Sequence, residues 1–201
     1  MILVALEGIE GSGKTSVTEA LEQAEVPDLT LCCTGELRSP IGPLLRNRLP
    51  QLSPLERVHW FAADRASTLE QVRTSIDIEQ PTVVVWDRYL DSARAYRSAE
   101  VELGVAPLEI LELVERVNQA FPAPDRVLFL DTDPSVARAR LARVDREPDT
   151  RMLGALRYYR DRARQESDVF RTIDGGLPLD EVVASVVEQL GRDYGRSDRT
   201  T

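Results

Sequence analysis

The chain has 201 residues, a hydrophobic content of 42% and a formal net charge of −9 at pH 7. This length predicts one compact domain with a sizeable core, and the acidic balance argues against broad binding to nucleic acid. No apolar stretch of ~18 residues occurs, and a strand is predicted at the very start, so we expect neither a membrane span nor a signal peptide. The adjacent Cys32 and Cys33 do not indicate a disulfide scaffold, which fits a cytoplasmic protein.

Strands and helices are predicted to alternate along the chain. Apolar runs predict strands at residues 2–6, 29–33, 82–86, 127–130 and 169–173. Helical spacing, together with proline and aspartate at helix starts, predicts helices at residues 15–25, 54–75, 107–120, from 134, 151–166 and 179–190. Because alternating strands and helices build parallel sheets covered on both faces, we expect an α/β fold with three layers around a five-stranded parallel sheet. Residues 1–190 are expected to form one domain, followed by a polar tail at 191–201.

The segment Gly8 to Thr15 reads GIEGSGKT and directly follows the first predicted strand. The pattern G-x-x-x-x-G-K-T is a phosphate-binding loop, in which backbone N–H groups cradle phosphates, lysine reaches the β- and γ-oxygens and threonine binds Mg²⁺. Lys14 is the only lysine, and arginine takes every other strongly basic position, so a compact ammonium is favoured here over a planar guanidinium. We expect an ATP site formed by Gly8, Glu10, Gly11, Ser12, Gly13, Lys14 and Thr15.

A second group of candidates follows the strand predicted at 82–86. Ligands of parallel α/β sheets bind beyond the carboxyl ends of the strands, where Asp87 and Arg88 stand. The carboxylate of Asp87 is the usual second half of a phosphate-loop site, either holding Mg²⁺ with Thr15 or positioning Lys14. A capping role at the strand–helix junction is the alternative for Asp87. The guanidinium of Arg88 offers bidentate hydrogen bonds to a phosphate.

Phe61 and Arg65 form a candidate base pocket. Their i, i+4 spacing places ring and guanidinium on one face of the helix predicted at 54–75, where a flat base can stack on one and bond the other. Core packing is the alternative for Phe61 alone. Ser92 and Tyr96 share a face with Tyr89 if that segment is helical.

Together these segments resemble the thymidylate kinases, a family of nucleoside monophosphate kinases. The matching stretches are residues 7–15, 61–66, 87–96 and 124–131, which appear in the family's order. The resemblance implies the P-loop kinase fold with a short lid, and a homodimer. It also implies Mg²⁺-dependent transfer of the γ-phosphoryl group of ATP to the 5′-phosphate of dTMP, giving dTDP and ADP.

The resemblance further implies a role for each matching side chain in acceptor binding. Phe61 would stack on thymine, Arg65 would bond its carbonyl edge and Tyr96 would lie against C2′ of the sugar. Arg88 would hold the acceptor phosphate, and Glu10 would lie near the 3′-hydroxyl and Mg²⁺. The remaining substrate-binding candidates are Glu36, Arg38 and Ser92.

The catalytic arginine is expected from the lid, roughly residues 143–151. Some family members carry an arginine at the loop position that Gly11 occupies here, whereas others supply it from the lid. This chain resembles the second kind. The candidates to neutralise charge on the transferred group are Arg143, Arg146 and Arg151.

Two departures from the family pattern bear on base selectivity. The chain reads TGELRS at 34–39, where the family commonly has TREPGG, and Ala93 replaces a polar side chain that contacts the base in many relatives. One alternative is therefore a kinase for another deoxynucleotide, such as a modified dUMP, or for a deoxynucleoside. Another is a regulatory ATPase, which would lack a pyrimidine pocket.

Overall fold

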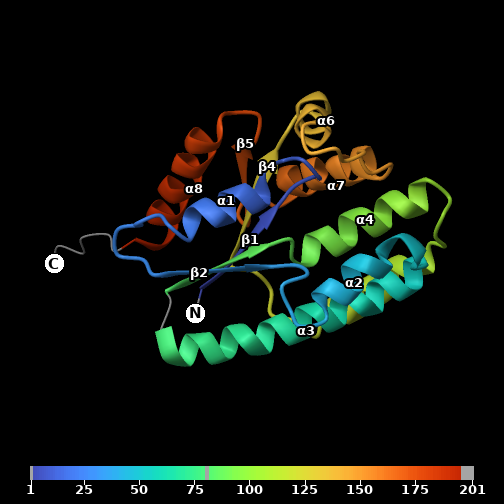
Figure 1. The fold of residues 1–201 in the computed structure, drawn as a ribbon, viewed down its shortest axis with the longest axis horizontal. Helices are drawn as coiled ribbons and strands as arrows, with labels where there is room; N and C mark the ends of the chain where they lie inside the picture. Colours follow the sequence, from blue (N-terminus) through green and yellow to red (C-terminus); the bar gives the residue numbers. More distant parts are fainter. Residues whose placement is uncertain (1, 80–81, 196–201) are drawn as a thin grey trace.

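The computed structural model describes residues 2–79 and 82–195 of the chain. Five strands form one sheet in the order β2-β3-β1-β4-β5, and all neighbouring pairs are parallel (Figure 1). The strands are β1 (Ile2–Glu7), β2 (Leu31–Gly35), β3 (Val83–Asp87), β4 (Arg126–Asp131) and β5 (Phe170–Asp174). The predicted α/β fold with a five-stranded parallel sheet is confirmed.

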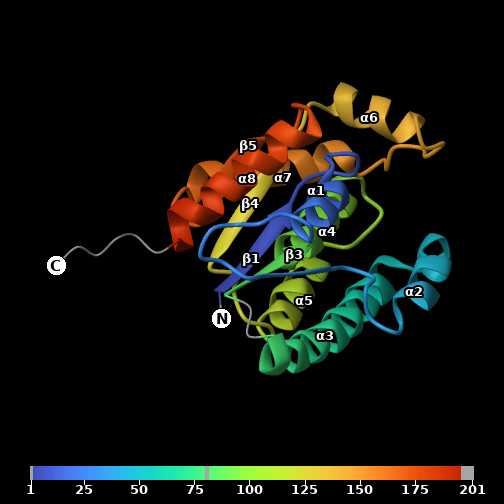
Figure 2. The same cartoon turned by 60° about the vertical axis from the view of Figure 1, so that its left-hand side comes forward.

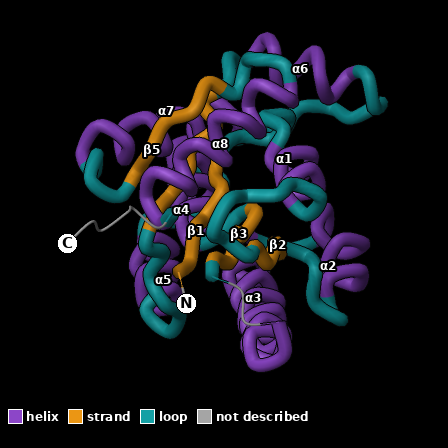
Figure 3. The backbone as a smooth tube through the Cα atoms, turned by 90° about the vertical axis from the view of Figure 1, so that its left-hand side faces the viewer, coloured by secondary structure: helices purple, strands orange, loops and turns teal. Residues whose placement is uncertain are grey.

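Helices cover both faces of this sheet (Figures 2 and 3). The α-helices among the described residues are α1 (Lys14–Leu21), α2 (Gly42–Arg48), α3 (Pro54–Glu79), α4 (Leu90–Glu102), α5 (Glu109–Asn118), α6 (Pro134–Ala142), α7 (Met152–Gln165) and α8 (Leu179–Tyr194). A short 3₁₀ helix, η1 (Leu49–Gln51), follows α2. None of these helices is long and apolar enough to cross a membrane.

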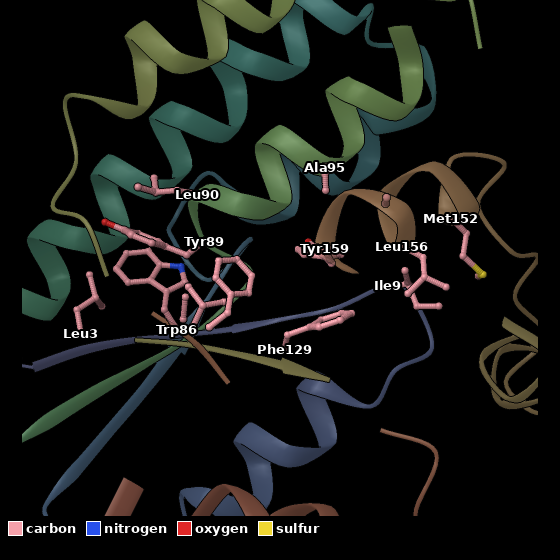
Figure 4. Close-up of a cluster of buried hydrophobic side chains, with 14 of the residues drawn as sticks. Leu3, Ile9, Trp86, Tyr89, Leu90, Ala95, Phe129, Met152, Leu156 and Tyr159 are labelled. Carbon is pink, nitrogen blue, oxygen red and sulfur yellow. The ribbon is translucent and has the colours of Figure 1, made fainter. Parts of the chain in front are cut away.

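Alternation along the strands divides the core into two large clusters. Leu3 and Ala5 of β1 face a cluster that includes residues of α3, α4 and α7, whereas Val4 and Leu6 face α1 and α8. Because both faces are covered, the strands read as continuous apolar runs instead of alternating with polar residues. Figure 4 shows the first cluster, in which Trp86 packs on Tyr89 with ring centroids 4.9 Å apart.

The register brings three strand ends together. Asp87 pairs with Leu6 of β1 on one side and with Gly35 of β2 on the other. The segments that follow β1, β2 and β3 therefore start side by side at one edge of the sheet, where the predicted site residues lie.

Some element bounds differ from the predictions. β2 lies at 31–35 instead of 29–33, and α8 continues beyond Leu190 to Tyr194, so the start of the predicted polar tail is helical. The rest of that tail, 196–201, lies outside the described residues.

Candidate active site

A cavity of about 830 Å³ lies beyond the carboxyl ends of β1, β2 and β3. Its lining joins the phosphate-binding loop to α3, α4, α5 and the segment between α6 and α7. Arginine and lysine side chains outnumber acidic ones in this lining, although the chain as a whole is acidic. The cavity is therefore suited to anionic ligands.

The phosphate-binding loop encloses Lys14. The buried ammonium donates hydrogen bonds to the carbonyl oxygens of Gly8 (2.9 Å) and Ile9 (2.7 Å) and to Oγ of Ser12 (3.0 Å). Burial and the neighbouring Arg88 lower the pKa of Lys14 to about 7. Because all three acceptors are uncharged, an anion above the loop would stabilise the charged amine.

Gly11 cannot be replaced by a larger residue without moving α6. Its φ of +78° lies in the left-handed region, and an added Cβ would stand 2.5 Å from the carbonyl oxygen of Ala137. An arginine at this loop position is therefore excluded by the packing of α6 on the loop. This agrees with the expectation that a catalytic arginine comes from the lid.

Thr15 and Asp87 meet at the end of β3. The hydroxyl of Thr15 donates to Oδ2 of Asp87 at 2.9 Å, whereas Oδ1 of Asp87 is buried and has no hydrogen-bond partner among the described residues. A hydroxyl oxygen and an unsatisfied carboxylate oxygen are ligands that suit Mg²⁺, which completes its shell with water and phosphate oxygens. The two residues therefore fit a magnesium site.

Arg88 and Tyr96 line the cavity and contact each other. Arg88 has a φ of +64°, which is strained for a non-glycine residue. The backbone N–H of Arg88 donates to the carbonyl oxygen of Leu6. Its guanidinium lies 5.5 Å from the ring centroid of Tyr96 and donates to the phenol oxygen at 3.4 Å. The guanidinium of Arg151 lies 5.2 Å from the same ring. The residue with the strained backbone thus contributes a cation to the cavity wall, against the ring of Tyr96.

Phe61 and Arg65 lie on the cavity side of α3, as their spacing predicts. The guanidinium of Arg65 is only 4% exposed, and burial lowers its pKa. It donates to the carbonyl of Tyr89 (3.2 Å) and to Oδ1 of Asn118 (3.4 Å), and it stacks between the rings of Tyr89 and Phe121. Among the described residues no carboxylate lies within ion-pair distance of this arginine.

The other predicted substrate-binding residues differ in position. Glu10 and Glu36 line the cavity, and burial raises the pKa of Glu36 to about 7. Ser92 also lines it, but the Ser92 hydroxyl donates to a carboxylate oxygen of Glu7 at 2.6 Å. Arg38 is exposed and does not line the cavity.

The three candidate lid arginines all line the cavity. Arg143 directly follows α6, and Arg146 pairs with Glu10 of the phosphate-binding loop. Arg151 precedes α7 and pairs with Asp149 at 2.6 Å. The segment 143–151 therefore brings three guanidinium groups to the cavity, and one of them, Arg146, contacts the phosphate-binding loop.

The sequence did not single out several residues that hold this site together. Asp64 accepts hydrogen bonds from the N–H of Leu37 and the hydroxyl of Ser39, which fixes the loop after β2. Arg140 of α6 donates to the carbonyl of Gly175 (2.7 Å) and lines the cavity. The one sequence signal for either residue is that Asp64 directly precedes Arg65, which the sequence does predict as a site residue.

Glu100 is the centre of a buried ionic cluster beside the cavity. Its carboxylate is 1% exposed and lies 2.8 Å from Arg57, 2.9 Å from Arg97 and 2.5 Å from Arg151. These arginines come from α3, α4 and the start of α7, and all of them line the cavity. One carboxylate therefore connects three walls of the site.

We expect Glu100→Gln to lower the free energy of unfolding by ~3–5 kcal/mol, because it leaves the buried Arg97 and the partly exposed Arg57 and Arg151 without their shared anion. Urea denaturation at pH 7 measures this. Glu102→Gln on the same helix is the matched control, because Glu102 is 47% exposed in its pair with Arg157 and such pairs contribute less than ~1 kcal/mol. Equal losses in the two variants would contradict the structural role of Glu100.

Comparison with known proteins identifies the family. A family model described as thymidylate kinase matches residues 6–186. The chain is 33% identical over 200 residues to a probable thymidylate kinase of Pyrobaculum aerophilum, covering 96% of this chain and 97% of the relative. It is 33% identical over 199 residues to a thymidylate kinase of Halorhodospira halophila, covering 91% and 90%. It is 32% identical over 198 residues to a thymidylate kinase of Bordetella pertussis, covering 93% of each.

These matches span nearly the whole chain and agree with the parallel sheet and the loop described above. They confirm that the protein is an enzyme, an ATP-dependent nucleoside monophosphate kinase. The chain belongs to the thymidylate kinase family.

Proposed function

We propose that this enzyme transfers the γ-phosphoryl group of ATP to the 5′-phosphate of dTMP, giving dTDP and ADP. The observation that carries this proposal is one cavity with two differently built halves. One half is the phosphate-binding loop with Lys14, and the other holds Phe61 and the buried guanidinium of Arg65. Arg88 lines the same cavity and would hold the acceptor phosphate where it faces the donor phosphate.

The reaction depends on how the two phosphates are positioned more than on proton transfer. The acceptor phosphate is already an anion, so no general base is needed. In-line alignment of acceptor and donor, with electrostatic stabilisation of the transition state, accelerates the transfer. Lys14 and the loop N–H groups would bind the β- and γ-phosphates, while Arg88 would hold the acceptor phosphate. Arg143, Arg146 and Arg151 would neutralise charge on the transferred group.

Thr15 and Asp87 would hold Mg²⁺ through their hydroxyl and carboxylate oxygens. The ion, when bound, neutralises negative charge on the phosphate oxygens of ATP. The unsatisfied Oδ1 of Asp87 supports this assignment.

In the acceptor half, Phe61 would stack on the thymine ring and Arg65 would donate to its carbonyl edge. Tyr96 would lie against the sugar and disfavour ribose. The remaining residues that we propose to contact the acceptor are Glu10, Glu36 and Ser92, whereas Arg38 lies outside the cavity and is not proposed. We further propose a cytoplasmic homodimer of single kinase domains, in which residues 143–151 act as the lid.

An acceptor panel tests the proposal. With ATP and Mg²⁺, we expect kcat/KM for dTMP to exceed that for dUMP by ~10-fold or more, as one methyl group in an apolar pocket allows. ADP formation should be negligible with thymidine or without any acceptor. The panel should include 5-hydroxymethyl-dUMP and dCMP. Preference for thymidine would indicate a deoxynucleoside kinase, and acceptor-independent hydrolysis would indicate a regulatory ATPase.

A further inference from the structure

Asn118, the last residue of α5, is a polar side chain in the wall of the acceptor half that sequence reasoning did not identify. It is 3% exposed and lines the cavity. Its amide nitrogen donates to the carbonyl of Leu90 at 3.3 Å, and its Oδ1 accepts from Arg65 at 3.4 Å. Because nitrogen and oxygen have different partners, this network fixes which end of the amide faces Arg65.

Arg65 and Asn118 together offer a donor next to an acceptor. A guanidinium has five N–H donors, and the protein acceptors described for Arg65 are Oδ1 of Asn118 and the carbonyl of Tyr89. An amide oxygen has two lone pairs, of which Arg65 uses one. Both side chains therefore retain hydrogen-bonding capacity, and both line the same cavity.

Ala93 stands in the same cavity wall and contributes only a methyl group. It cannot bond a base edge, whereas Arg65 and Asn118 in the same cavity both can.

This pair matches the edge of thymine and opposes that of cytosine. Thymine presents the O4 acceptor beside the N3–H donor, whereas cytosine presents the N4 amino donor beside the unprotonated N3 acceptor. We propose that Asn118 determines base specificity: its Oδ1 accepts from N3–H of the pyrimidine while it orients Arg65 toward O4. This inference rests on the proposed function and names the group that excludes cytosine.

The test compares Asn118→Leu with the wild type on dTMP and dCMP at saturating ATP. Leucine keeps the volume of the side chain and removes both hydrogen bonds. We expect kcat/KM for dTMP to fall by ~30–100-fold, mainly through KM, because N3–H is left without a partner. We expect kcat/KM for dCMP to stay the same or to rise, because leucine removes the acceptor oxygen that opposes the unprotonated N3 of cytosine. Discrimination between the bases should therefore fall at least in proportion to the loss with dTMP.

Two further variants make the result decisive. Asn118→Asp keeps an acceptor oxygen and should retain more activity with dTMP than Asn118→Leu. Asn47→Leu, in which an exposed asparagine of α2 outside the cavity is changed, should leave both substrates unaffected. If Asn118→Leu does not fold, Asn118→Ala allows the same comparison with a smaller side chain.

An equal loss with dTMP and dCMP would assign Asn118 to a structural role and overturn the inference. Unchanged discrimination in a folded variant would do the same. Failure of the proposed function has a different signature, because the wild type itself would then not phosphorylate dTMP.

Discussion

Lys14→Ala is expected to lower kcat by at least ~10³-fold, which is ~4 kcal/mol of transition-state stabilisation. The ammonium is buried in the loop and held by two carbonyls and one hydroxyl, so its charge is available to phosphate oxygens. No other lysine exists in the chain to replace it. Initial rates of ADP formation with saturating ATP and dTMP measure the loss. A variant with a near-normal rate would refute the mechanism.

Two variants separate charge, shape and folding at this position. Lys14→Arg keeps the positive charge but is expected to lose most activity, because a planar guanidinium does not fit between Gly8, Ile9 and Ser12. Lys14→Met keeps the length of the side chain without charge. It should not lower the free energy of unfolding at pH 7, because burial already lowers the pKa of this lysine from 10.5 to about 7. If Lys14→Met is inactive but as stable as the wild type, the lost activity therefore results from the missing charge and not from unfolding.

The parts of the site that the sequence predicts are those formed by local pattern or by the rule for parallel sheets. The loop from Gly8 to Thr15 is encoded in consecutive residues. The meeting of Thr15 with Asp87 follows from the strand-end rule, because parallel strands end at the same edge of the sheet. The fold class follows for the same reason, since strands buried on both faces read as apolar runs.

The parts that the sequence does not predict depend on contacts between distant elements. No local pattern around Glu100 indicates that it is buried, yet packing of α3, α4 and α7 buries it among three arginines. The partner of Arg65 is Asn118 on α5, and no local spacing connects the two. Buried polar partners of this kind follow from tertiary packing, which propensity and periodicity do not contain.

Two differences between predicted and observed elements have physical reasons: strand pairing sets the bounds of β2, and α2 is too short to be recognised from its sequence. β2 runs from Leu31 to Gly35 because these residues pair with Val83 to Asp87 of β3, a long-range register that the local apolar run at 29–33 does not contain. α2 was not predicted because its seven residues are too few to show helical periodicity.

Arg88→Ala is expected to lower kcat/KM for dTMP by ~10²–10³-fold, because the cavity loses a charge-assisted contact to the acceptor phosphate. The KM for ATP should change by less than ~3-fold, because Lys14 and the loop remain intact. Arg94→Ala is the matched control on the same stretch of chain. Arg94 pairs with Glu115 at 2.7 Å and does not line the cavity, so its loss should leave both constants near the wild-type values.

Arg88→Gly tests whether the backbone strain serves the site. At a φ of +64° glycine relieves ~1–2 kcal/mol of strain that alanine retains, so Arg88→Gly should be more stable than Arg88→Ala by about that amount. Activity should be equally low in both variants, because both lack the guanidinium. Denaturation curves and dTMP kinetics of Arg88→Gly and Arg88→Ala therefore separate the effect of backbone strain on stability from the effect of the guanidinium on activity. A gain in stability without a gain in activity would show that the fold accepts a strained backbone at a position whose side chain the reaction needs. Recovery of activity in Arg88→Gly would contradict the role of the guanidinium in holding the acceptor phosphate.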